Sequence, residues 1–72
     1  MDKFEAMQRF VLVAQSGSFT KAADALGLPK SSVSHSVQSL EKALGIRLFH
    51  RSTRSVTLTQ DGETYFPQCQ AI

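Results

Sequence analysis

The chain has 72 residues, which is enough for one domain with a modest core. Its single cysteine, Cys69, excludes an internal disulfide, so packed helices must supply the stability. We find no apolar run long enough to span a bilayer and no N-terminal signal segment. These absences predict a cytoplasmic protein with no membrane partner.

The net charge of +2 is small, but the charges are unevenly distributed. Residues 29–60 contain five of the eight lysines and arginines and only one of the six acidic residues. Nucleic-acid binding requires such a basic segment, because contacts to phosphates supply most of the affinity.

Two helices are predicted in the N-terminal third of the chain. The first should run from Lys3 to Gln15, because apolar residues recur there at steps of three and four: Phe4, Met7, Phe10, Val11 and Ala14. Ser18 is a good N-cap for a second helix over Phe19 to Leu26, with Ala22, Ala23 and Leu26 facing inward.

A third helix is predicted from Pro29, as its first helical residue, to Leu44. Its buried stripe should be Val33, Val37, Leu40 and Leu44. Gly27 before it can adopt the left-handed backbone that ends a helix, and Gly45 can close the third helix in the same way. Two short helices joined by a tight glycine turn have the layout of a DNA-reading helix-turn-helix.

The outward side of the third helix is small, polar or basic and carries no acid. A helix that enters the major groove needs such a face, so we predict DNA contacts from Lys30, Ser31, Ser32, Ser34, His35 and Gln38. The second helix begins with Ser18 and Thr20, where free N–H groups suit a phosphate. Ser18 could equally be only a cap, and both interpretations stay open.

The helical period is lost between Arg47 and Thr59. The runs 48–50 and 56–58 favour strands, and residues 52–55 can turn, which predicts a small hairpin beside the third helix. A last helix should begin after Thr59 and be interrupted or ended by Pro67. Its apolar residues, Tyr65 and Phe66, could pair with a second copy or pack against the first helix.

The order of these residues resembles the N-terminal DNA-binding domain of LysR-type transcriptional regulators. The resemblance extends from Phe4 to Gly62, and its most specific part is the run Leu40-Glu41, Leu44-Gly45, Arg47-Leu48-Phe49 and Arg51. Further matches are Phe10-Val11, Val13-Ala14, Ser16-Gly17-Ser18-Phe19-Thr20, Ala22-Ala23, Leu26-Gly27, Val33-Ser34, Val37, Leu58-Thr59 and Gly62.

The resemblance implies a mainly α, winged helix-turn-helix fold of a bacterial regulator: a three-helix core, a two-stranded wing and the start of a C-terminal linker helix. We expect residues 1–58 to form the DNA-binding domain and residues 59–72 to begin a truncated linker helix, with Tyr65 and Phe66 in a homodimer. A small-molecule effector would act only through a separate domain, absent here. The wing adds three expected contacts to phosphates or the minor groove: Arg51, Thr53 and Arg54.

The chain departs from the common family pattern at two places. Pro29-Lys30 stands where Ser-Gln is frequent, and His35 stands where Arg is frequent. Lysine favours guanine or phosphate whereas glutamine can bond adenine, so these changes concern the target sequence rather than the binding mode.

Two other classes of protein would leave different patterns in the sequence. A winged helix that binds protein would leave the third helix apolar or acidic, which it is not. An enzyme would need a nucleophile triad, metal-ligand spacing or a phosphate-binding glycine loop, none of which the sequence contains. We therefore expect no catalysis, no metal and no cofactor.

Overall fold

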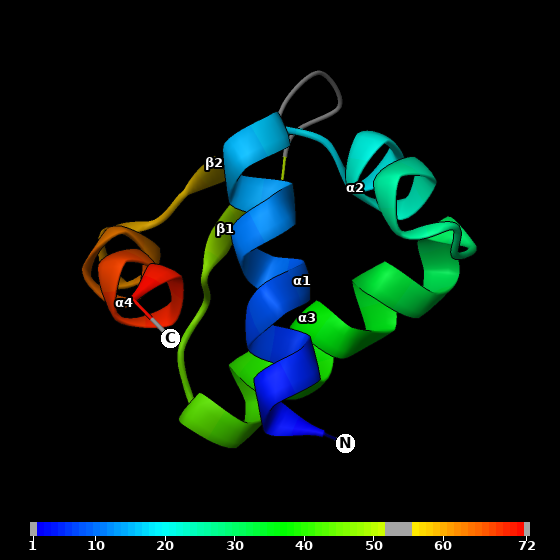
Figure 1. Cartoon of the computed structure of the whole chain (residues 1–72). Helices are drawn as coiled ribbons and strands as arrows, with labels where there is room; N and C mark the ends of the chain where they lie inside the picture. Colours follow the sequence, from blue (N-terminus) through cyan, green and yellow to red (C-terminus); the bar gives the residue numbers. More distant parts are fainter. Residues whose placement is uncertain (1, 52–55, 72) are drawn as a thin grey trace.

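The computed structural model describes residues 2–51 and 56–71, with Arg51 described by its backbone alone. These residues form four helices and one two-stranded antiparallel sheet (Figure 1). In chain order the elements are α1 (Lys3–Ser16), α2 (Phe19–Leu26), α3 (Lys30–Leu44), β1 (Phe49–Arg51), β2 (Val56–Leu58) and α4 (Gln60–Gln70). The mainly helical, winged architecture predicted from the sequence is confirmed.

The core lies where α1, α2 and α3 meet the inner side of β1. Its largest side chains, all at most 1% exposed, are Phe10, Val13, Val33, Val37, Leu40, Leu48 and Phe49. The centres of the Phe10 and Phe49 rings lie 5.3 Å apart, so α1 packs directly against the first strand of the wing. The stripe predicted for α3 lies in this cluster, whereas of the stripe predicted for α1 only Phe10 is fully buried; Ala6 and Val13, which were not predicted, are the other buried residues of α1.

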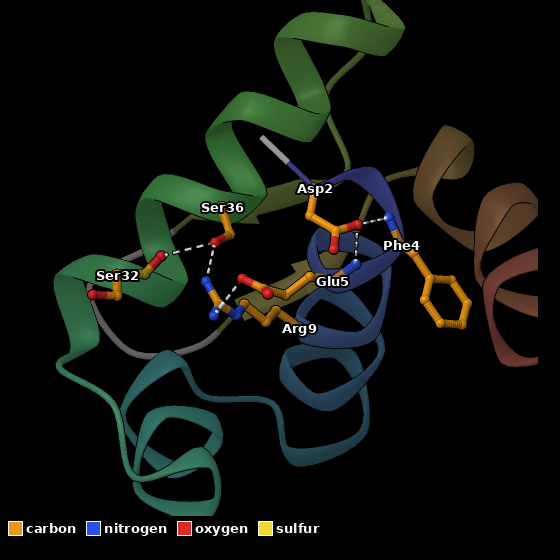
Figure 2. A network of polar contacts seen from close by, with 6 residues as sticks. All are labelled: Asp2, Phe4, Glu5, Arg9, Ser32 and Ser36. Carbon is orange, nitrogen blue, oxygen red and sulfur yellow. Dashed lines mark hydrogen bonds and ion pairs between the residues drawn. The ribbon is translucent and has the colours of Figure 1, made fainter.

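The sequence placed two apolar residues inside that the structure leaves outside. Phe4 is 50% exposed and Leu26 is 37% exposed. Phe4 lies in the first turn of α1, and its ring points away from α3 in Figure 2. Leu26 is the last residue of α2, next to the exposed Gly27. Periodicity gives the direction of a side chain but not whether anything covers it.

The two prolines also differ from expectation. Pro29 is the N-cap of α3 and not its first helical residue, because its ψ of 145° is extended and the helix begins at Lys30. Pro67 does not end α4, which continues to Gln70. Pro67 is exposed, so water can satisfy the Glu63 carbonyl that the missing proline N–H leaves without a helical partner.

Helix α4 packs against α1 and beside the wing (Figure 1). The centre of the Phe10 ring lies 5.7 Å from that of Tyr65 and 6.2 Å from that of Phe66. Both aromatic residues are half-buried. Within a single chain, these two side chains therefore pack against the first helix, one of the two arrangements that the sequence left open.

Candidate nucleic-acid interface

The turn between α2 and α3 is built on Gly27. Its φ of 68° is left-handed, and its N–H donates to the carbonyls of Ala23 and Asp24. The Leu28 N–H also donates to the Ala23 carbonyl, at 3.0 Å. Ala22 and Ala23 are at most 2% exposed, so the small side chains let α2 lie close to its neighbours. The helix-turn-helix layout predicted from glycine and alanine spacing is confirmed.

Helix α3 divides cleanly into a buried and an exposed side. Val33, Val37 and Leu40 are 0% exposed. Of the six residues predicted to read DNA, four are exposed and two, Ser32 and Ser34, are half-buried; the exposed ones are Lys30, Ser31, His35 and Gln38. Because no acidic residue lies between Lys30 and Leu40, this face presents hydrogen-bonding groups and one fixed positive charge.

Helix α2, which packs against α3, begins at a capped N-terminus. Ser18 has an extended backbone, and its hydroxyl accepts the Lys21 N–H at 3.2 Å. Its role as a helix cap is confirmed. Thr20 lies exposed in the first turn. Contact of either residue with a phosphate stays a prediction.

The predicted wing is a short antiparallel hairpin. Phe49 pairs with Leu58, His50 with Thr57 and Arg51 with Val56. The backbone of Arg51 thus lies at the tip-side end of β1. Two of the predicted wing contacts, Thr53 and Arg54, lie outside the residues that the structure describes.

Glu41 joins α3 to the wing, a role that sequence reasoning missed. The residue is only 7% exposed, and its Oε2 accepts the backbone N–H of Leu48 at 2.7 Å and that of Phe49 at 3.4 Å. The Nε of Arg47 lies 3.8 Å from the same oxygen. The signal was available, because Glu41 follows Leu40 on the buried side of α3, where an acid needs partners.

A second contact lies at the same open end of the wing, on its other strand. The Thr59 hydroxyl donates to the Arg47 carbonyl at 2.5 Å and accepts the Gly62 N–H at 2.9 Å. Gly62 is buried, and a Cβ there would lie 2.2 Å from the Leu48 carbonyl oxygen. Thr59 was predicted as a cap, which is confirmed, but the close approach of Gly62 to Leu48 was not foreseen.

The described residues offer little support for other kinds of site. Among them, no group of three His, Cys, Asp or Glu residues could hold a metal ion. No helix within the described ranges is long and apolar enough to cross a membrane. Cys69 is 6% exposed, and burial raises the pKa of its thiol, against the opposing effects of the Tyr65 hydroxyl and the Lys3 ammonium.

Comparison with known proteins agrees with this geometry. The family model described as bacterial regulatory helix-turn-helix protein, lysR family, matches residues 4–63. An HTH-type transcriptional repressor of Pseudomonas aeruginosa is 58% identical over 72 residues, which are 100% of this chain and 23% of that protein. The chain spans about a quarter of the length of such curated relatives.

Two solved structures have the same fold. The BenM DBD/benA site 1 DNA complex is 35% identical, covers 94% of this chain and 76% of its own, and has a TM-score of 0.90. Hydrogen-peroxide-bound OxyR of Corynebacterium glutamicum is 34% identical, covers 94% of this chain and 21% of its own, and has a TM-score of 0.92. With the family match over residues 4–63, these findings establish that the chain belongs to the lysR family of bacterial regulatory helix-turn-helix proteins.

Proposed function

We propose that this chain binds double-stranded DNA sequence-specifically, with α3 in the major groove and the wing against the backbone or the minor groove. The observation that carries the proposal is the acid-free exposed face of α3, held on a core whose main side chains are fully buried. A groove-reading helix needs such a face on a rigid support. The BenM DBD, at 35% identity, has been solved with DNA.

We assign the roles of individual residues from their places on the helices. Lys30 and His35 are exposed and would choose the base sequence, while half-buried Ser34 would mainly position α3. Contacts that support these are proposed for Ser31, Ser32 and Gln38 on α3. The start of α2, with Ser18 and Thr20, would hold a phosphate.

The wing is proposed to add contacts to the DNA backbone through Arg51, Thr53 and Arg54. Replacing Arg51 or Arg54 with Ala should weaken binding to every duplex and lower the salt slope by about one each. Binding should be measured over a range of salt concentrations. Unchanged slopes in both variants would remove the wing from the interface.

The assembly follows from the same proposal. A protein that carries this domain would act as a homodimer on two half-sites, with α3 helices about 34 Å apart or a multiple of that distance. Residues 1–58 would form the DNA-binding unit, and residues 59–72 would begin the linker helix between copies. A small-molecule effector would bind another domain, and the protein would work in the cytoplasm.

The test of the proposed function is a binding selection on randomised duplexes, followed by titration of the selected duplex at several salt concentrations. We expect one recovered sequence, bound more tightly than a scrambled duplex, with affinity that falls steeply with salt. If the selection recovers no preferred sequence and the chain shows no salt-dependent binding to any duplex, the domain would instead be a protein-interaction module.

A further inference from the structure

Arg9 forms a polar link between α1 and the first half of α3. Its Nη1 donates to the Ser36 Oγ at 2.5 Å, and its Nη2 lies 2.6 Å from the Glu5 Oε1 (Figure 2). The Ser36 hydroxyl in turn donates to the Ser32 carbonyl at 3.0 Å. One guanidinium therefore connects the rigid first helix to the backbone of the helix that would read DNA.

The start of α3 is poorly held by its own sequence. Pro29 makes no side-chain cap bond, whereas Asp2, Ser18 and Thr59 cap the other three helices of the described chain. The first turn of α3 also lacks an acidic residue that would offset the helix dipole. An uncapped helix start frays more readily, so the early turns of α3 depend on tertiary contacts, of which the fully buried Val33 supplies the apolar part.

Arg9 is suited to give that support. Its side chain is only 17% exposed and follows α1 next to Phe10, which is 0% exposed and fixes this part of the helix. The Ser36 hydroxyl has one proton, which it gives to Ser32, so its lone pairs are left to accept from Arg9. Arg9 thus fixes the Ser36 rotamer and, through it, the second turn of α3.

We propose that Arg9 is a positioning residue for DNA reading: through Ser36 and Ser32 it holds the uncapped start of α3, and with it Lys30 and His35, in one orientation. The effect on DNA reading rests on the proposed function, whereas the hold of Arg9 on the start of α3 does not. A charged hydrogen bond between α1 and α3 stabilises the reading geometry without touching DNA. Losing it should reduce discrimination between duplexes and leave contacts to phosphates intact.

The test compares three variants of the chain. Arg9→Met keeps the length of the side chain but removes its donors, and Ser36→Ala removes the acceptor. Lys3→Met is the matched control, because it removes one positive charge from the same helix without affecting the link. We expect the preference for the selected duplex over a scrambled one to fall about tenfold in Arg9→Met and in Ser36→Ala, which is the scale of one charged hydrogen bond.

The double variant Arg9→Met/Ser36→Ala separates a link from two independent effects. If the two residues act as one unit, the double variant loses no more preference than either single variant. The salt slope should stay that of the parent in all variants. A slope lowered by about one in Arg9→Met, with Ser36→Ala unchanged, would make Arg9 a phosphate contact and overturn the proposal.

Amide hydrogen exchange without DNA tests the link apart from the proposed function. We expect the amides of residues 33–36 to exchange about tenfold faster in both single variants, with no change at Phe10 or Val13, and no change anywhere in Lys3→Met. Exchange like that of the parent in Arg9→Met and Ser36→Ala would overturn the proposal. If exchange is faster in these variants but the parent chain selects no duplex, Arg9 still holds the start of α3, and only the proposed role in DNA reading is rejected.

Discussion

Lys30 is exposed at the first position of α3, from which a long side chain can reach a base edge. We expect Lys30→Gln to change the preferred base at one position in each half-site instead of lowering affinity for all sequences evenly. A good base contact contributes roughly 1–3 kcal/mol of discrimination. The measurement is a selection on randomised half-sites, with Lys42→Gln in the last turn of α3 as the control. Recovery of the parent sequence by Lys30→Gln would show that another residue chooses that base.

The Cys69 thiol should make stability depend on pH, because burial in the folded state raises its pKa. Near neutral pH the thiol is protonated in both states, so it adds no pH dependence. Above about pH 8.5 the unfolded thiol loses its proton first, and the free energy of unfolding should fall as pH rises. Burial also raises the pKa of Tyr65, so the hydroxyl acts in the same direction at higher pH.

The thiol prediction can be checked by denaturant unfolding of the parent and of Cys69→Ala from pH 7 to 10. We expect the variant to be less stable at pH 7, because it loses packing of α4 against the core, but to lose less stability on going to high pH. Parallel pH profiles would mean that the Cys69 thiol does not contribute to the alkaline loss.

At the scale of elements, Glu41 holds the wing against α3. Glu41→Ala would leave the buried N–H groups of Leu48 and Phe49 without this acceptor. Each unsatisfied buried donor costs about 1–3 kcal/mol, so we expect a loss of about 3 kcal/mol or more in the free energy of unfolding. Chemical denaturation measures the loss, with exposed Asp24→Asn as a control within about 0.5 kcal/mol of the parent. Equal stability of Glu41→Ala would show that water replaces the carboxylate.

Gly62 determines how closely α4 approaches the wing. A Cβ at this position would lie 2.2 Å from the Leu48 carbonyl oxygen, a backbone atom that cannot simply rotate away. Alanine favours a helix by roughly 1 kcal/mol over glycine, but the clash should outweigh that gain and make Gly62→Ala about 1–3 kcal/mol less stable. Exposed Thr64→Ala on the same helix should not destabilise the chain, and thermal unfolding compares the two. A more stable Gly62→Ala would mean that the Leu48 backbone, just before β1, moves at little cost.

At the scale of the whole molecule, the sequence predicts what local patterns control. The stripe of α3, the caps at Ser18 and Thr59 and the turn at Gly27 were each predicted, because each depends on residues within one or two turns. The stripe of α1 was predicted only in part, since the buried Ala6 and Val13 were missed. The exposure of Phe4 and the Arg9–Ser36 contact depend on how distant segments meet, which periodicity does not encode. The exposed, acid-free face of α3 was predictable from the sequence, but the contacts of Arg9 with Ser36 and of Glu41 with the start of β1 required the structure.

Association of two copies is the property of the whole molecule that can be tested most directly. Tyr65 and Phe66 already contact Phe10, so α4 has little apolar surface left for a second copy. The 11 residues of α4 extend only about 16 Å, so one face of this helix offers little area. Stable interfaces bury about 1,200–2,000 Å² in total. We therefore expect this chain to sediment as a monomer at micromolar concentration.

Addition of a palindromic operator should load two copies on one duplex, because the symmetry of the site then brings the copies together. Analytical ultracentrifugation with and without that duplex makes the comparison. A tight dimer without DNA would contradict the expectation and reveal a further apolar surface. The candidate is the groove lined by Val11, Leu12, Leu26 and Cys69, between α1 and the ends of α2 and α4. If the parent is a dimer through this groove, Leu12→Glu should separate the copies, because it places a charge there. If the parent is a monomer, the variant should sediment like the parent.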